Sequence, residues 1–94
     1  MEKQVRVISQ GPLVENQWTP ENGQQRTIAN VEVRLKSGID EFIAQATGDL
    51  ARTINSKKLD LDGLYEVQLK MSVSKGKTEG IYFNNLKIID IQQL

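Results

Sequence analysis

The sequence predicts an all-β domain with one short helix, in which five strands close a small Greek-key barrel. Three observations lead there. Residues 29–36 and residues 64–74 alternate strictly between apolar and polar side chains, as half-buried strands do. Only residues 48–58 change to a helical period. A half-open sheet with a helix on one face is the alternative arrangement.

The central element of the predicted fold is an antiparallel hairpin over residues 27–47. In its first strand the apolar residues fall at odd positions, and they are Ala29, Val31, Val33 and Leu35. Ser37-Gly38 follows as a turn. Phe42, Ala44 and Ala46 then alternate with Glu41, Ile43, Gln45 and Thr47, so the two runs are expected to pair.

The chain before this hairpin supplies the first strand. Residues 4–10 fit a strand, which Gly11-Pro12 interrupts with a bulge or a sharp bend. Whether the strand resumes at Leu13-Val14 is left open. Residues 15–25 are polar and contain turn chemistry at residues 19–23, so no separate strand is expected there.

The chain after the hairpin supplies the helix and two more strands. Leu50 and Ile54 lie four apart in residues 48–58, which predicts a helix of about three turns with one apolar stripe. Residues 64–74 form the fourth strand and residues 81–91 the fifth, with a bulge expected at Asn84-Asn85. The predicted core comprises Ala29, Val31, Val33, Leu35, Phe42, Ala46, Val67, Leu69 and Leu86.

Composition limits the possible functions. The 94 residues fit a single domain, and 12 basic side chains balance 12 acidic ones. The sequence has no cysteine and no histidine, so we expect no disulfide, no thiolate metal site and no nucleophile–base pair. We therefore predict no enzyme, no cofactor, no metal and no small-molecule substrate. No apolar run suits a signal peptide or a membrane span, so a soluble cytoplasmic protein without membrane contact is expected.

Two local patterns have simpler explanations. Gly76-Lys77-Thr78 is similar to the end of a phosphate-binding P-loop, but Met71 stands where the motif begins with glycine, and the loop joins two strands. Asp60 and Asp62 are interpreted as turn residues and not as metal ligands.

Four stretches occur in a characteristic order and spacing: VISQGPL at residues 7–13, WTPENG at 18–23, ANVEV at 29–33 and EFIAQATGDLA at 41–51. Together they resemble the oligonucleotide-binding (OB) domain of bacterial single-stranded DNA-binding proteins. The primosomal replication protein N family shares the fold and is a close second match. The resemblance implies a non-catalytic protein that binds single-stranded DNA, with RNA left open, as an accessory in DNA replication, repair or transfer. It also implies a homodimer or homotetramer.

The sequence departs from that family at three places. Asp49 stands where the family often has lysine, the strand over residues 41–47 has few aromatic residues, and the chain ends at Leu94 without the family's acidic tail. A neutral charge and few aromatic residues favour the alternative function, an OB-fold protein–protein interaction module without nucleic-acid binding.

Candidate nucleic-acid contacts follow from basic side chains and exposed rings, since single-strand binders combine a basic groove with stacking platforms. Trp18 holds the family's aromatic position, although an interface role is equally open. Arg34 and Lys36 lie on the polar strand face, where Glu32 and Glu41 could instead neutralise them. The complete set of candidates is Trp18, Arg26, Arg34, Lys36, Ile43, Gln45, Lys70, Lys75, Lys77 and Tyr82.

Overall fold

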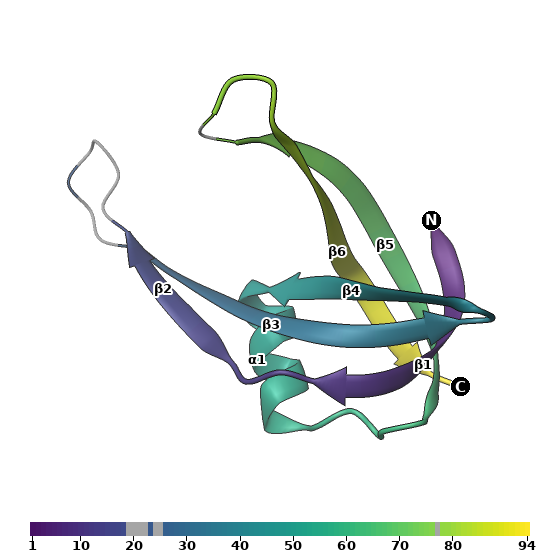
Figure 1. Ribbon diagram of the computed structural model, residues 1–94. Helices are drawn as coiled ribbons and strands as arrows, with labels where there is room; N and C mark the ends of the chain where they lie inside the picture. Colours follow the sequence, from purple (N-terminus) through teal and green to yellow (C-terminus); the bar gives the residue numbers. More distant parts are fainter. Residues whose placement is uncertain (19–22, 24–25, 77) are drawn as a thin grey trace.

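The computed structural model describes residues 1–18, 23, 26–76 and 78–94, with the backbone alone for Trp18 and Arg26 (Figure 1). The strands and the helix follow one another as β1 (Glu2–Gln10), β2 (Val14–Trp18), β3 (Arg26–Ser37), β4 (Asp40–Thr47), α1 (Gly48–Ser56), β5 (Leu64–Lys75) and β6 (Tyr82–Gln93).

The predicted fold class is confirmed, because the strands close into a ring. The sheet order runs β1-β5-β6-β4-β3, and β1 pairs with β3 as well, which completes the circuit. Within the described residues, each strand pairing is antiparallel except that of β4 with β6, where Gln45 and Lys87 alone are register partners. The ring is thus closed most weakly between β4 and β6.

The polar stretch after Gly11-Pro12 is a strand, which the sequence interpretation missed. β2 pairs with β3 from Val14 opposite Asn30 to Trp18 opposite Arg26. The break before it is real, since Gly11 N–H donates to the Glu32 carbonyl over 2.8 Å. A β-carbon at Gly11 would lie 3.2 Å from that same oxygen, so the small residue permits the close approach. β1 and β2 therefore act as two halves of one bent strand.

The bulge expected at Asn84-Asn85 is also displaced. Those residues pair regularly with Val73 and Ser72, and the register instead shifts between Gln68 and Leu69, opposite residues 88–90 of β6. The side-chain parity of β6 therefore changes at Ile89, which explains why its apolar pattern looked irregular.

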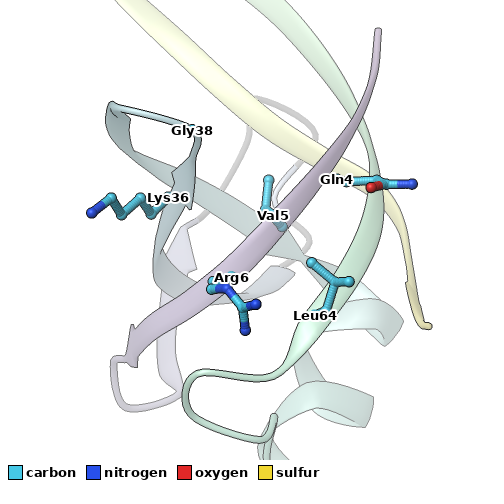
Figure 2. Close-up of a pocket in the computed structure, with 6 residues that line it drawn as sticks. All are labelled: Gln4, Val5, Arg6, Lys36, Gly38 and Leu64. Atoms are coloured by element: carbon cyan, nitrogen blue, oxygen red, sulfur yellow. The ribbon is translucent and has the colours of Figure 1, made fainter.

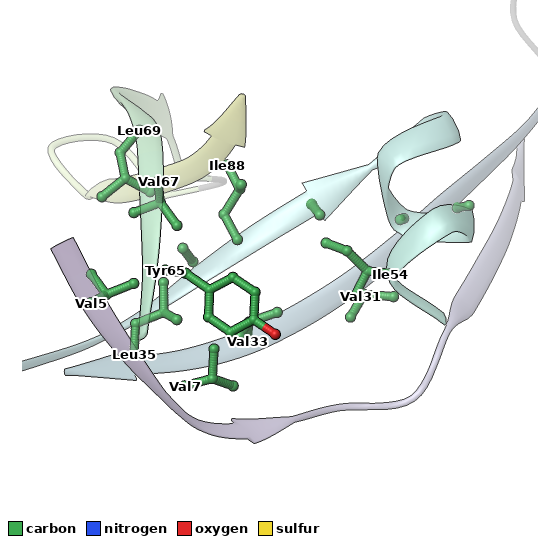
Figure 3. Close-up of a cluster of buried hydrophobic side chains, with 14 residues drawn as sticks. Val5, Val7, Val31, Val33, Leu35, Ile54, Tyr65, Val67, Leu69 and Ile88 are labelled. Atoms are coloured by element: carbon green, nitrogen blue, oxygen red, sulfur yellow. The ribbon is translucent and has the colours of Figure 1, made fainter. Parts of the chain in front are cut away.

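The core fills the interior of the ring (Figure 3). Its members are Val5, Val7, Ala29, Val31, Val33, Leu35, Ala44, Ala46, Ala51, Ile54, Tyr65, Val67, Leu69 and Ile88. Seven of the nine predicted core residues are among them. Phe42 and Leu86 are only half-buried and pack against the edge of this cluster.

Helix α1 packs against β3 and β4 and covers one end of the core. It begins at Gly48, whose φ of 62° lies in the region that favours glycine. Ala51 and Ile54 are its buried residues. The side chain of Gln10 on β1 holds the C-terminal end of the helix. Its Nε2 donates to the Ile54 carbonyl over 3.2 Å, and its Oε1 accepts from Leu59 N–H, just after the helix, over 2.9 Å.

Among the buried core residues that the structure describes, Tyr65 alone has a polar side-chain group, and that group has a partner. Its hydroxyl oxygen accepts a hydrogen bond from Asp60 N–H over 2.9 Å. Because Tyr65→Phe leaves that donor unpaired in a partly buried site, we expect a loss of about 1–2 kcal/mol in the free energy of unfolding. Urea denaturation of both proteins measures it, and identical midpoints would contradict the role of this bond.

Two arms extend beyond the ring (Figure 1). One is the β2–β3 hairpin and the other is the distal half of the β5–β6 hairpin. The chain exposes 6831 Å², whereas a compact monomer of this size exposes about 5,500 Å². The arms therefore add surface without adding core.

Candidate nucleic-acid interface

The outer face of the ring is the side opposite the core, and β3 and β4 supply its centre. Their outward residues face each other in register, with Glu32 opposite Gln45, Arg34 opposite Ile43, and Lys36 opposite Glu41. The inward residues between them, such as Val33 and Ala44, are fully buried. The alternation predicted from the sequence therefore places Arg34, Lys36, Ile43 and Gln45 together on one surface.

The centre of this face is close to neutral. Arg34 forms an ion pair with Glu41, and Gln45 Nε2 donates to Glu32 Oε1 over 3.4 Å. Ile43 is more than half exposed between them, with a shallow pocket beside it that Arg34, Glu41 and Phe42 complete. Arg34 is thus neutralised in the free protein, as the alternative interpretation of this face expected.

A second group of residues continues the outer face from β4 across β6 to β5. Gln45 is the register partner of Lys87, and Lys87 is the register partner of Lys70. We call Gln45, Lys87 and Lys70 the cross-strand row. Both lysines are exposed, and neither forms an ion pair within the described part of the chain. Because like charges directly opposite each other are destabilising, this pair suits an anionic ligand.

The β5–β6 arm carries the outer face further. Ser74 is opposite Phe83, and Ser72 is opposite Asn85, so these residues share the side of Lys70 and Lys87. Asn85 Nδ2 donates to Ser74 Oγ. The Phe83 ring lies so close to Gly76 that a β-carbon there would be 3.0 Å from its Cε2. Phe83 is nevertheless 57% exposed, so the ring packs against Gly76 on one side while much of its surface stays accessible to a ligand.

The comparisons with known proteins identify the fold. The chain is similar to the second OB-fold domain of replication protein A from Methanococcus maripaludis, with a TM-score of 0.61 and 13% identity, over 99% of this chain and 81% of that one. This chain has an OB fold. A small single-stranded DNA-binding protein from Streptomyces coelicolor also matches, with a TM-score of 0.43 and 17% identity, over 99% and 93% of the two chains. No protein-family model matches the sequence, and no curated protein matches it significantly.

The other side of the β5–β6 arm of this OB domain carries exposed apolar residues beside Lys75 and Asn84. Tyr82 is opposite Lys75 there, in phase with Val73 and Met71. Met71, Val73 and Tyr82 are each more than 60% exposed, and we call these three residues the arm strip. Met71 and Val73 have the parity of the buried Tyr65, Val67 and Leu69 on β5, but the arm carries them past the core. The neighbours Tyr82 and Phe83 project from opposite sides of the arm, and both are exposed.

Three candidates fall outside what the structure describes. They are Lys77 and the side chains of Trp18 and Arg26, whose roles stay predictions. Lys75 is described and lies on the arm-strip side, away from Lys70. Lys87 and Phe83 were missed because the shifted bulge concealed the parity of β6. A basic residue paired opposite Lys70 was the signal that could have identified Lys87.

Two other kinds of site are not found in the described residues. They contain no group of three or more acidic, histidine or cysteine side chains arranged for a metal ion. They also contain no helix long and apolar enough to cross a membrane.

Proposed function

We propose that this OB domain binds single-stranded DNA across its outer face, without catalysing a reaction. The observation that carries the proposal is the Lys70–Lys87 pair, which brings two unneutralised cations together on the same face as the exposed ring of Phe83, four residues further along the arm. Lysines would contact the phosphates of the backbone, and the ring would stack on a base. An accessory role in DNA replication, repair or transfer fits such a binder.

The sequence resemblance to single-stranded DNA-binding proteins supports this proposal. The fold supports it as well, since the matched structure with a TM-score of 0.61 is an OB-fold domain of replication protein A. The neutral centre around Arg34 and Glu41 does not oppose it, since an approaching phosphate competes with Glu41 for Arg34. The net charge of zero implies that binding depends on local charge, so it should be modest and sensitive to salt.

A salt titration tests the proposal. We expect labelled oligothymidine to bind, as followed by fluorescence anisotropy, with log K falling against log salt by about 0.7 per phosphate contacted. Lys70→Gln/Lys87→Gln should flatten that slope by about 1.4, because two phosphate contacts are lost. Lys57→Gln/Lys58→Gln, which removes the same charge just after α1, is the matched control and should leave the slope unchanged.

The outcomes separate cleanly. No binding by the unmodified protein at low salt would reject the proposal. Equal slopes for the two double variants would move the ligand away from the cross-strand row. Stronger binding to oligouridine than to oligothymidine would identify RNA as the ligand.

The arm strip favours a second candidate, a protein-interaction module. Met71, Val73 and Tyr82 form an exposed apolar surface of the kind that mediates association between chains. A homodimer or homotetramer built through this surface is our proposal for the assembly. Light scattering of Met71→Ser/Val73→Ser against the unmodified protein checks it, and a monomer in both cases at tens of micromolar protein would reject it.

A further inference from the structure

A pocket of about 380 Å³ opens on the outer face where β1 meets β3, at the end of β3 far from the arms (Figure 2). Gln4, Val5, Arg6, Lys36, Gly38 and Leu64 line it. Its basic members, Arg6 and Lys36, come from neighbouring strands, and Leu64, which is opposite Arg6, supplies its exposed apolar side chain. The sequence interpretation included Lys36 among its candidates and did not include Arg6.

Arg6 and Lys36 are direct register partners across β1 and β3. Both point outward, because Val5, Val7 and Leu35 beside them are buried. Two cations at this spacing repel each other unless a counter-charge lies between them. The pair therefore repeats, on another pair of strands, the arrangement of Lys70 and Lys87.

No carboxylate of the described chain neutralises this pair. Glu41 is opposite Lys36 on its other side, but it is paired with Arg34. Glu66 is in register with Gln4, while Arg6 is opposite the uncharged Leu64. Among the described residues, neither Arg6 nor Lys36 forms an ion pair.

Arg6 is also held in position. Its Nη1 donates to the Asp62 carbonyl over 2.9 Å. The turn that carries this carbonyl is fixed to β1, because Asp62 N–H donates to the Val7 carbonyl over 2.7 Å and Val7 N–H donates to the Gly63 carbonyl over 3.2 Å. A guanidinium has five N–H donors, so this single bond leaves others for a ligand while reducing the rotamer freedom lost on binding.

From this geometry we infer that the pocket is a phosphate subsite for the same single strand, which rests on the proposed function. Arg6 and Lys36 bind one phosphodiester group together, and Leu64 packs against its ribose. Arg34 lies between this pocket and the cross-strand row, next to Ser9 of β1. A strand that occupies the row can therefore cross the β3–β4 centre and end on β1.

Charge-removing variants test the subsite. For Arg6→Gln/Lys36→Gln we expect the salt slope for oligothymidine to flatten by about 0.7, because one phosphate contact is lost, and the affinity at 0.1 M salt to fall by roughly 5-fold. Lys36→Gln alone leaves the bond from Arg6 to the turn intact and should cost about half of that loss in logarithmic terms. Lys57→Gln/Lys58→Gln again serves as the matched control, and the backbone amides of Arg6 and Lys36 should shift in NMR spectra when oligothymidine is added.

The failures of the two proposals are distinguishable. If the unmodified protein binds oligothymidine and both Arg6→Gln/Lys36→Gln and Lys36→Gln keep its affinity and slope, the subsite is wrong and the function stands. If the unmodified protein does not bind, the proposed function fails, and the subsite fails with it.

Discussion

Leu35→Ala should lower the free energy of unfolding by about 2–5 kcal/mol. Leu35 is fully buried, and its side chain is among the largest that the core encloses completely. Its register partners are Val7 on β1 and Phe42 on β4, so it packs where β3 joins both of its neighbours in the ring. Removing it leaves a cavity that the surrounding strands cannot easily close.

The size of this effect is large for so small a domain. A domain of this length has a stability of about 5–15 kcal/mol, and each kcal/mol shifts its melting temperature by about 4–8 °C. Thermal unfolding followed by circular dichroism should therefore show a decrease of at least 8 °C.

Ile39→Ala is the matched control, because it removes an aliphatic side chain that is 96% exposed in the same hairpin. It should change stability by less than about 0.5 kcal/mol. Equal effects of the two substitutions would show that the ring does not enclose Leu35. If Leu35→Ala does not fold, Ile88→Val gives a milder test at about 0.5–1.5 kcal/mol.

The parts of the fold that the sequence predicts are those governed by uninterrupted periodicity. The β3–β4 hairpin, α1 and the first half of β5 follow because each position's burial depends on local alternation or on a single helical stripe. β2 was missed because its residues, Val14–Trp18, are mostly polar and exposed, and their pairing with β3 comes from tertiary context.

The candidate site, like the fold, was predictable where alternation within one hairpin fixes the face on which a side chain lies. Arg34, Lys36, Ile43 and Gln45 share a face because one hairpin fixes their parity. Lys87 was missed because a bulge was expected at Asn84-Asn85, between it and the hairpin turn, whereas the pairing runs unbroken from the turn past Lys87. Arg6 could not be assigned, since its importance lies in its pairing with Lys36, and the pairing of β1 with β3 is a property of the closed ring and not of either segment alone.

Phe83→Ala should weaken binding of oligothymidine by about 1–3 kcal/mol, which is roughly 5- to 150-fold. Phe83 shares its side of the arm with Lys70 and Lys87, and its ring is held against Gly76. A held ring loses little conformational freedom when a base stacks on it. Fluorescence anisotropy measures the loss, and Phe83→Tyr should retain most of the affinity because it keeps the stacking surface.

Tyr82→Ala is the matched control, since Tyr82 is the adjacent residue and is similarly exposed, but projects from the opposite side of the arm. If the strand follows the cross-strand row, Tyr82→Ala should leave the affinity within about twofold, a change under 0.5 kcal/mol. The reverse pattern, with Tyr82 essential and Phe83 dispensable, would place the strand against the arm strip. The arm strip would then be the nucleic-acid surface and not an interface between chains, so this one pair of variants assigns a role to each side of the arm.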